Sequence, residues 1–265
     1  MSDLLYKTLN GVAYLTMNRP EVRNALSPEM IQLMLDALQR CEADEDVRCV
    51  VLQGAGGHFL AGGDVKSFLE LSSQPPGERR DTLSSRIHGS FNRLVHTLQK
   101  LDKPVIASVQ GGAAGGGVSL ALACDLVLVS EDAFFTLAYS KIGSSPDGGI
   151  TWNLPRLVGV KKAMELALLG DRFTATEALE MGLVNRLVPA SKLATETRVL
   201  AERLARGPTR ALVNTKRLIL RSSVCSLEEQ LHAEAETFGQ TAMTEDWVEG
   251  VTAFNEKRTA QFSGN

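Results

Sequence analysis

Two glycine-rich segments of the 265-residue sequence could bring main-chain N–H groups to a reacting atom. Residues 54–57 and 111–117 each follow a short apolar run, and each is expected to lead into a helix. The first N–H groups of a helix have no partner within it, so they attract anions or developing negative charge. Neither segment has the glycine spacing of a dinucleotide-binding or P-loop motif. Two converging amides would suit an oxyanion hole, although glycines that merely turn the chain also explain either segment alone.

A carboxylate, Asp147, stands in Ser145-Pro146-Asp147-Gly148-Gly149, just ahead of a predicted helix. This sequence favours a type I turn, and aspartate also caps helices, so a purely structural role explains Asp147 locally. The alternative is acid–base chemistry. Beside a hole that stabilises an enolate, one carboxylate can take a proton from one carbon and return it to another. An apolar pocket would raise the pKa of such a carboxyl toward the working pH.

The other reactive side chains do not form the patterns of further catalytic classes. Ser119, in Gly-Val-Ser-Leu-Ala, resembles a nucleophile elbow, but the final glycine is absent. The four histidines lack H-E-x-x-H spacing and the four cysteines make no C-x-x-C pair, so no metal site is predicted. A formal charge of −3 without a basic stripe argues against a nucleic acid partner.

Strands and helices alternate through the first part of the chain. Apolar runs predict strands at residues 11–17, 49–53, 105–109, 125–130 and 134–137. Ser27-Pro28 marks the start of one helix, and a 3.6-residue apolar period predicts another over residues 87–101. From residue 151 onward the pattern is mostly helical, with one strand at residues 183–188. An α/β core followed by a helical C-terminal part is therefore expected.

Residues 72–80 combine Pro-Pro-Gly with a run of charges and are expected to form an exposed, mobile loop. No window holds the roughly 18 apolar residues of a membrane span, and the first ten residues lack the pattern of a secretion signal. We therefore expect no membrane association. The widely spaced cysteines make a reducing cytoplasm the expected location.

Four motifs in this order resemble those of the crotonase (enoyl-CoA hydratase/isomerase) superfamily, and the resemblance runs from residue 12 to residue 264. They are Asn-Arg-Pro-Glu-Val-Arg-Asn-Ala-Leu at 18–26, Phe-Leu-Ala-Gly-Gly-Asp-Val-Lys at 59–66, Lys-Pro-Val-Ile-Ala at 103–107 and Ala-Gly-Gly-Gly at 114–117. The resemblance implies a spiral of repeated ββα units over residues 1–200. It also implies a C-terminal helical region, residues 201–265, that builds a homotrimer or a dimer of trimers and completes the CoA site.

The resemblance also assigns roles to individual residues. The N–H groups of Gly63 and Gly116 would bind the thioester oxygen of an acyl-CoA substrate. CoA enters only as part of that substrate, and no permanently bound cofactor is implied. The positions that resemble CoA contacts are Val22, Arg23, Ala61, Lys66, Phe254 and Lys257, the last two reaching a neighbouring subunit. Helical spacing of Val248, Val251 and Phe254 equally suits a packing face.

The two glutamates that hydratases of this family use to add water fall at Ser119 and Tyr139 in this sequence. Neither can act as a carboxylate base, whereas Asp147 stands where related isomerases carry their acid. Residues 140–156 resemble the ring-1,2-epoxyphenylacetyl-CoA isomerase branch. We therefore expect an isomerase that shifts a double bond from the 3 to the 2 position of an enoyl-CoA, or that isomerises a ring epoxide. Ser119, Tyr139 and Trp152 are expected at the substrate pocket, although both aromatic side chains could equally belong to the core.

Two alternatives stay open at this point. One is a hydratase that acts on a branched or unusual enoyl-CoA in fatty-acid, terpenoid or aromatic degradation, with Asp147 positioning the water. The other is an acyl-CoA-binding protein that has lost its activity. Acyl-chain identity depends on the variable stretch at residues 67–91, where His88 has no assigned role.

Overall fold

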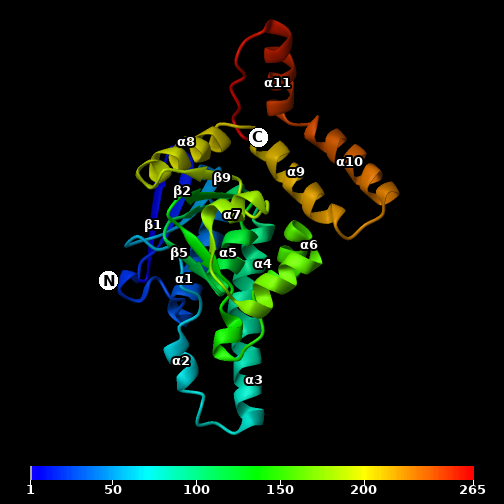
Figure 1. Ribbon diagram of the computed structural model, residues 1–265. Coiled ribbons are helices and arrows are strands. Elements are labelled where there is room, and N and C mark those ends of the chain that lie inside the picture. Colours follow the sequence, from blue (N-terminus) through cyan, green and yellow to red (C-terminus); the bar gives the residue numbers. More distant parts are fainter. Residues whose placement is uncertain (1) are drawn as a thin grey trace.

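The computed structural model describes residues 2–265 and is built on a six-stranded sheet (Figure 1). Its strand order is β1 (Leu4–Leu9), β2 (Val12–Met17), β3 (Cys49–Gly54), β4 (Val105–Val109), β6 (Leu126–Ser130) and β9 (Arg186–Val188). Within this sheet only the β1–β2 pair is antiparallel. A second sheet joins β5 (Gly112–Ala114), β7 (Phe134–Thr136) and β8 (Phe173–Thr174). The alternation of strands and helices expected from the sequence is present.

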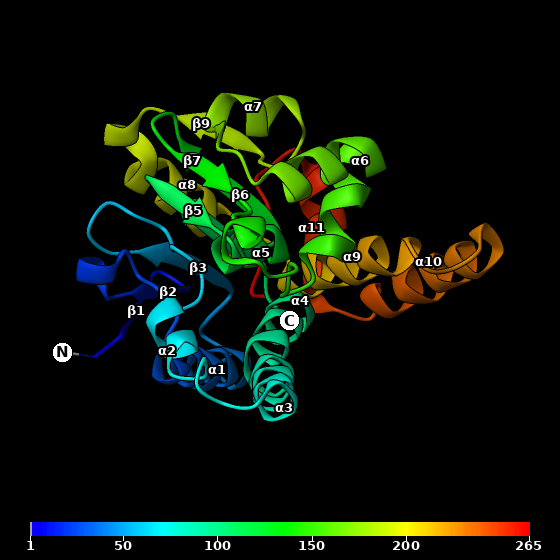
Figure 2. The same cartoon turned by 60° about the horizontal axis from the view of Figure 1, so that its bottom comes forward.

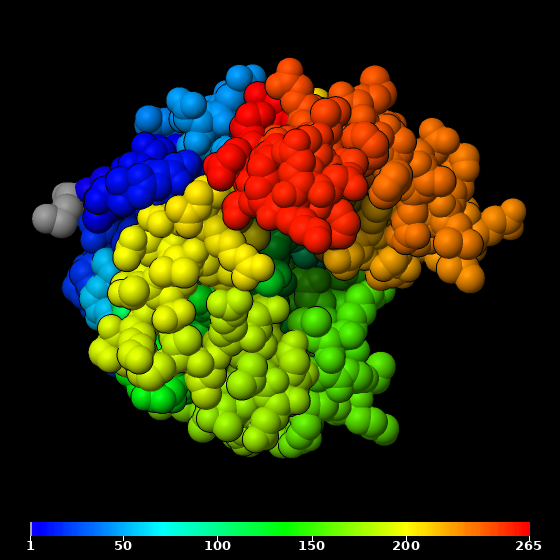
Figure 3. All heavy atoms as spheres, turned by 90° about the horizontal axis from the view of Figure 1, so that it is seen from above, coloured from blue at the N-terminus to red at the C-terminus, as the bar shows by residue number. Residues whose placement is uncertain are grey.

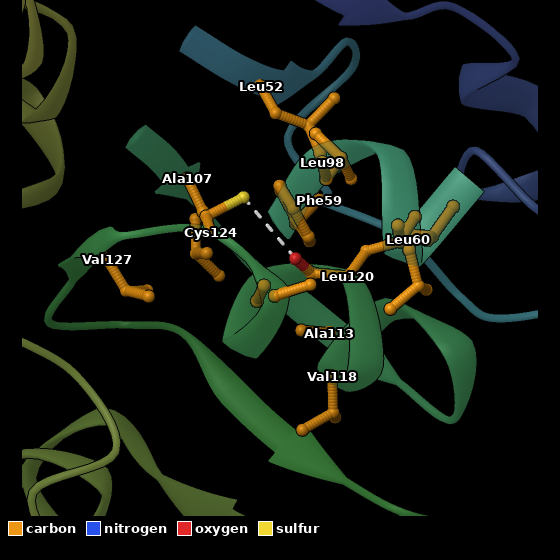
Figure 4. Packing of buried hydrophobic residues seen from close by; sticks show 14 of the residues in the cluster. Leu52, Phe59, Leu60, Leu98, Ala107, Ala113, Val118, Leu120, Cys124 and Val127 are labelled. Atoms are coloured by element: carbon orange, nitrogen blue, oxygen red, sulfur yellow. Dashed lines mark hydrogen bonds between the residues drawn. The ribbon is translucent and has the colours of Figure 1, made fainter. Parts of the chain in front are cut away.

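Helices cover both faces of the large sheet, which is why its strands read as continuous apolar runs. Alternate residues such as Val51 and Ile106 pack against α8 (Leu193–Ala205). The other set packs against α1 (Pro28–Ala43), α4 (Asn92–Lys100) and α5 (Gly116–Ala123). Figure 4 shows part of that larger core, where Phe59, Leu60 and Leu120 meet around α5 and the Cys124 thiol bonds to the Leu120 carbonyl at 3.3 Å. The small residues of α5 let it lie deep in this core (Figure 2).

The remaining helices lie at the ends and flanks of the sheets. They are α2 (Val65–Leu69), α3 (Pro76–Arg86), α6 (Ile150–Leu169), α7 (Ala175–Glu180), α9 (Thr209–Ser222), α10 (Leu227–Thr241) and α11 (Glu245–Glu256). Short turns of 3-10 helix occur at Pro20–Val22, Tyr139–Ile142 and Ala190–Lys192, and one π-helical turn at Ile87–Phe91 joins α3 to α4. None of the helices within residues 2–265 is long and apolar enough to span a bilayer.

Three sequence-based expectations need correction. Residues 72–80 are not one loop, because α3 begins at Pro76; none of its residues is buried, so it carries no apolar period. Residues 54–57 do not start a helix, since the next helix begins only at Val65. Finally, β1, β5 and β8 lie outside the strands that the pattern predicts. β1 is a mostly exposed edge strand, and the other two have three residues or fewer, too short for a period.

The C-terminal helices extend away from the sheets (Figure 1), and seen from above they form a prominent part of the surface (Figure 3). Lys216 of α9 anchors them to the body by a 2.9 Å ion pair with Asp125, whose carboxylate also accepts a hydrogen bond from the Val105 N–H. The chain end folds back on α11, where Asp246 accepts hydrogen bonds from the N–H groups of Ser263 and Gly264. The helical C-terminal region expected from the sequence is thus present.

Candidate active site

The segment that carries Gly63 is held by main-chain bonds to Leu26. The Leu26 N–H donates to the Gly62 carbonyl at 2.8 Å, and the Asp64 N–H donates back to the Leu26 carbonyl at 3.1 Å. In a trans peptide the C=O and the following N–H point in opposite directions. Because the Gly62 carbonyl points at Leu26, the Gly63 N–H must point away from it.

The N–H of Gly116 is set in the same way at the first residue of α5. The Gly115 carbonyl accepts hydrogen bonds from the N–H groups of Val118 and Ser119, so it points into the helix. The Gly116 N–H of the same peptide therefore points out of the helix start. Gly115 adopts a φ of +50°, which favours glycine at this turn.

The segment that carries Gly63 packs directly on the segment that leads to Gly116. The Leu60 N–H donates to the Gly112 carbonyl at 3.2 Å, and the Ala114 N–H donates to the Leu60 carbonyl at 2.9 Å. At Gly62, with φ +95°, an added Cβ would lie 2.9 Å from the Ala114 oxygen and 3.5 Å from the Gly116 nitrogen. Only glycine at position 62 allows this approach. Neither Gly63 nor Gly116 donates its N–H to another described residue.

Arg19 and Asn24 explain why the motif at residues 18–26 has its particular residue types. Arg19 donates to the Ala25 carbonyl at 2.7 Å and pairs with Asp64 at 3.2 Å, next to Gly63. Asn24 is fully buried, and its amide donates to main-chain carbonyls of the segment that follows β3. Buried polar groups are costly unless paired, so these bonds fix the segment that leads to Gly63. The motif acts here as a clamp rather than as a reactive group.

Gly63, Gly116 and Asp147 line one cavity of about 720 Å³. Its walls are mainly apolar and include Leu26, Ile31, Phe68, Phe91, Leu137 and Ile142. Ala61 and Tyr139 also line it. The other charged side chains at the cavity, Glu70 and Arg86, are exposed to solvent. Such a concave, apolar space with a few converging polar groups is the usual form of a small-molecule site.

Asp147 is half-buried and hydrogen-bonded on one oxygen. The Tyr139 hydroxyl donates to Asp147 Oδ1 at 2.7 Å, and the Ser119 hydroxyl donates to the main-chain carbonyl of Asp147 at 3.0 Å. Burial raises the pKa of Asp147, although the hydrogen bond from Tyr139 opposes the rise. Burial and the charge of Asp147 raise the pKa of Tyr139, so the phenol stays protonated at neutral pH and acts as the donor. This carboxylate can therefore hold or release a proton inside the cavity.

Two residues expected at the substrate pocket lie outside the cavity. Ser119 is fully buried behind it and contacts Asp147 instead. Trp152 is 47% exposed on α6 and stacks with Arg156, whose guanidinium lies 3.3 Å from the ring centroid. Ile150 and Leu154 face the core, so a residue two positions along the helix points to the opposite side.

The expected CoA contacts fall into two groups. Ala61 lines the cavity, and its N–H donates to the Arg23 carbonyl at 3.0 Å, so Val22 and Arg23 lie beside the cavity without lining it. Lys66 is exposed in the first turn of α2. Phe254 is 84% exposed and Lys257 ends the same helix, α11. Figure 1 places α11 at the opposite end of the molecule from α2, so neither residue reaches the cavity of its own chain.

Phe91 is a site residue that sequence reasoning missed. It reads as one more apolar residue of a helix, but the π-helical turn at Ile87–Phe91 shifts the helical register just before α4. Its buried ring lines the cavity and lies against both Gly116 and Gly148. His88 of the same turn is exposed and does not line the cavity. No local signal in the sequence marks the π turn.

Within residues 2–265 no group of three or more His, Cys, Asp or Glu side chains is arranged to hold a metal ion. The mixed α/β fold, with Gly63, Gly116 and Asp147 at one cavity, agrees with the crotonase-type protein expected from the sequence, and comparison with known proteins shows the family. A family described as enoyl-CoA hydratase/isomerase matches residues 7–265. The chain belongs to the enoyl-CoA hydratase/isomerase family.

Individual relatives cover nearly the whole chain. The 1,2-epoxyphenylacetyl-CoA isomerase of Escherichia coli (strain K12) is 39% identical over 264 residues, which is 100% of this chain and 99% of that protein. A putative enoyl-CoA hydratase of Thermus thermophilus is 40% identical over 251 residues, covering 95% of this chain and 97% of that protein. The crystal structure of an enoyl-CoA hydratase from Polaromonas sp. JS666 superposes with a TM-score of 0.92 at 35% identity, covering 98% and 99% of the two chains. The family resemblance expected from the sequence is confirmed.

Proposed function

We propose that this enzyme is an enoyl-CoA isomerase that moves a proton with Asp147 and stabilises the intermediate with the N–H groups of Gly63 and Gly116. The observation that carries the proposal is the polar content of the cavity. Asp147 is the carboxylate partly removed from water, while Ser119 and Tyr139 occupy the positions of the two glutamates that family hydratases are expected to use.

The reaction follows from these groups. A 3-enoyl thioester loses a proton from its α carbon to Asp147, and the electrons move to the thioester oxygen, where the two main-chain N–H groups donate to it. Protonated Asp147 then returns the proton to the γ carbon, and the double bond settles between the α and β carbons. A single carboxylate serves both steps. The apolar walls favour the neutral acid, so Asp147 keeps the proton in the cavity between the two steps.

The same groups support isomerisation of a ring-epoxide thioester, and the E. coli relative bears the name 1,2-epoxyphenylacetyl-CoA isomerase. On this version of the proposal the enzyme would belong to phenylacetate catabolism. A hydratase is the second candidate. The Tyr139 hydroxyl beside Asp147 supports it, because the two groups together could orient a water, and several relatives are named as probable or putative enoyl-CoA hydratases.

CoA binding and assembly are part of the proposal. Ala61, Lys66 and the main chain at Val22 and Arg23 would contact CoA beside the cavity, and Phe254 and Lys257 would reach the CoA of a neighbouring subunit. Exposed apolar side chains on the C-terminal helices, such as Phe238, support assembly into a trimer or a dimer of trimers. The cytoplasm stays the location predicted from the sequence.

Incubation of the protein with 3-enoyl-CoA and, separately, with 2-enoyl-CoA tests the proposal. An isomerase forms the conjugated 2-enoyl product from the first substrate, seen as rising ultraviolet absorbance, without uptake of water. A hydratase instead adds water to 2-enoyl-CoA and leaves 3-enoyl-CoA unchanged. Binding of both esters without turnover of either, together with no turnover of a ring-epoxide CoA thioester, would identify a binding protein and refute the enzymatic proposal.

A further inference from the structure

The tyrosine beside the proposed base has no part in the proton transfer described above. We propose that Tyr139 is a positioning residue, which holds one oxygen of Asp147 so that the other oxygen faces the substrate. The inference rests on the proposed function, since it assigns Tyr139 a task only if Asp147 is the base. Tyr139 stands where hydration chemistry would need a carboxylate, and here it supports one instead.

The hydrogen bonds divide the Asp147 carboxylate into two unequal oxygens. Oδ1 accepts the Tyr139 hydroxyl at 2.7 Å, whereas Oδ2 has no hydrogen-bond partner among residues 2–265. Asp147 lines the cavity with Gly63 and Gly116. A carboxylate that is free to rotate would present either oxygen, and the bond from Tyr139 removes that freedom. A short bond to an ionised acceptor is also among the stronger hydrogen bonds in proteins.

Tyr139 is itself held firmly enough to orient another side chain. It is buried at the start of the 3-10 turn Tyr139–Ile142 and follows Ala138, which adopts a φ of +56°. That left-handed conformation is uncommon for alanine and persists only where the surrounding structure enforces it. The Tyr139 carbonyl also accepts the Ser144 N–H at 3.0 Å. The strained residue directly before Tyr139 thus sets the direction in which the phenol projects.

Ser119 connects this pair to the helix that carries a proposed oxyanion donor. Its hydroxyl donates to the Asp147 carbonyl at 3.0 Å and lies 3.4 Å from the Tyr139 hydroxyl. Ser119 and Gly116 both belong to α5. The base, its orienting phenol and one donor therefore form one rigid unit, which suits a reaction that needs sub-ångström placement.

Removal of the phenol hydroxyl should also change the acidity of Asp147. Titratable and charged groups at the cavity are Tyr139 from the 3-10 turn, Glu70 at the end of α2 and Arg86 at the end of α3, the last two exposed. Burial raises the pKa of Asp147, while the hydrogen bond from Tyr139 and one from its own main chain lower it; no charged side chain of residues 2–265 shifts it. Without the bond from Tyr139 the carboxylate loses its one side-chain donor, and its pKa should rise further.

The test compares Tyr139→Phe with the wild type by measuring kcat, KM and the pH dependence of kcat/KM on 3-enoyl-CoA. The variant keeps the ring and loses only the hydroxyl. We expect kcat to fall roughly tenfold to hundredfold, as for a hydrogen bond to a charged group, while KM stays within about twofold because the lost hydroxyl bonds to Asp147 and the ring that lines the cavity is kept. The acid limb of the profile, where kcat/KM falls as Asp147 is protonated, should move to higher pH.

Tyr14→Phe is the matched control, since it removes a buried hydroxyl with no hydrogen-bond partner among residues 2–265, on the side of β2 that packs toward α8 and outside the cavity. It should leave kcat and the acid limb unchanged. Ser119→Ala is a second variant. Its hydroxyl contacts the main-chain carbonyl of Asp147 rather than the carboxylate, so the acid limb should stay in place even if kcat falls. A limb that moves as far as in Tyr139→Phe would overturn the inference.

Asp147→Asn separates failure of this inference from failure of the proposed function. If Asp147→Asn keeps the wild-type rate, Asp147 is not the base and the proposed function fails. If Asp147→Asn is inactive while Tyr139→Phe keeps the wild-type kcat and pH profile, the proposed function stands and the positioning role is refuted. Thermal melting and binding of a saturated acyl-CoA confirm that each variant is folded, so that a lost rate reports on chemistry.

Discussion

The ring of Phe91 lies so close to Gly148 that a Cβ added to Gly148 would sit 2.3 Å from Phe91 Cε1 and 2.9 Å from Ser119 Cβ. Gly148 directly follows Asp147, so this contact fixes the main chain that carries the proposed base. The same ring lies against Gly116, where an added Cβ would be 3.1 Å from Phe91 Cζ. Phe91 therefore sets the spacing between one proposed donor and the carboxylate.

Gly148→Ala should destabilise the fold more than Gly143→Ala does. Both glycines have positive φ, +62° and +67°, so both substitutions carry a similar backbone cost of about 1 kcal/mol. Only at Gly148 does the new methyl group meet neighbours, since nothing lies within 4 Å of a Cβ at Gly143. Overpacking adds roughly 1–3 kcal/mol at Gly148. Urea denaturation measures the difference, and equal losses for the two variants would mean that the Phe91 contact is not tight.

As the pH is lowered, kcat/KM should begin to fall at a pH above the usual pKa of an aspartate side chain. Burial raises the pKa of Asp147, and the proposed base works only when ionised. As pH falls through the raised pKa, the carboxylate is protonated and kcat/KM is lost. We expect this acid limb above the ordinary aspartate value of about 3.9. A profile of kcat/KM against pH that stays flat down to this ordinary value would argue that a different group limits the reaction.

Lys66→Ala should weaken binding of the CoA ester more than it changes turnover by the saturated enzyme. The ammonium group is exposed near the cavity and would meet CoA phosphates, so its contribution should shrink as salt increases. KM and the dissociation constant of a saturated acyl-CoA should both rise several-fold at low salt. Lys192→Ala, at a remote 3-10 turn, is the control. A loss of kcat without a change in binding would remove Lys66 from the CoA site.

Lys216→Met should destabilise the protein far more than Arg217→Met, although the residues are adjacent on α9. Lys216 is largely buried and pairs with the partly buried Asp125, and its removal leaves that carboxylate without its charged partner, which costs up to about 3–5 kcal/mol where the pair is buried. Arg217 pairs with Asp102 at the surface, where an ion pair contributes about 0–1 kcal/mol. Free energies of unfolding from urea titration check this. Similar values for both variants would show that the Lys216 pair does not anchor α9.

Sequence reasoning predicted those strands, helices and site residues that a local pattern or motif marks. The strand at β3 and the helix capped by Ser27 carry clear periodic or capping signals, and the motifs placed Gly63, Gly116 and Asp147, which line one cavity in the structure. Their proposed roles stay predictions. Sequence pattern could not show that Ser119 lies behind the cavity or that Trp152 points outward, because helical phase relative to the core decides both.

Two irregular backbone features near the proposed site were likewise beyond the sequence. The Tyr139 hydrogen bond to Asp147 depends on the left-handed backbone at Ala138, a residue type that gives no sign of it. The place of Phe91 depends on a single π-helical turn. Both features arise from packing of the whole chain rather than from propensity of the residues themselves, and both lie at the proposed site.

Turnover of 3-enoyl-CoA by Asp147→Asn, compared with Glu70→Gln, tests the account most directly. Both variants neutralise a carboxylate that lines the cavity, but Glu70 is exposed at its rim. The account predicts that Asp147→Asn loses about 10²–10⁴-fold in kcat with acyl-CoA affinity nearly unchanged, while Glu70→Gln stays close to wild type. A wild-type rate in Asp147→Asn would contradict it and leave Asp147 as a turn residue.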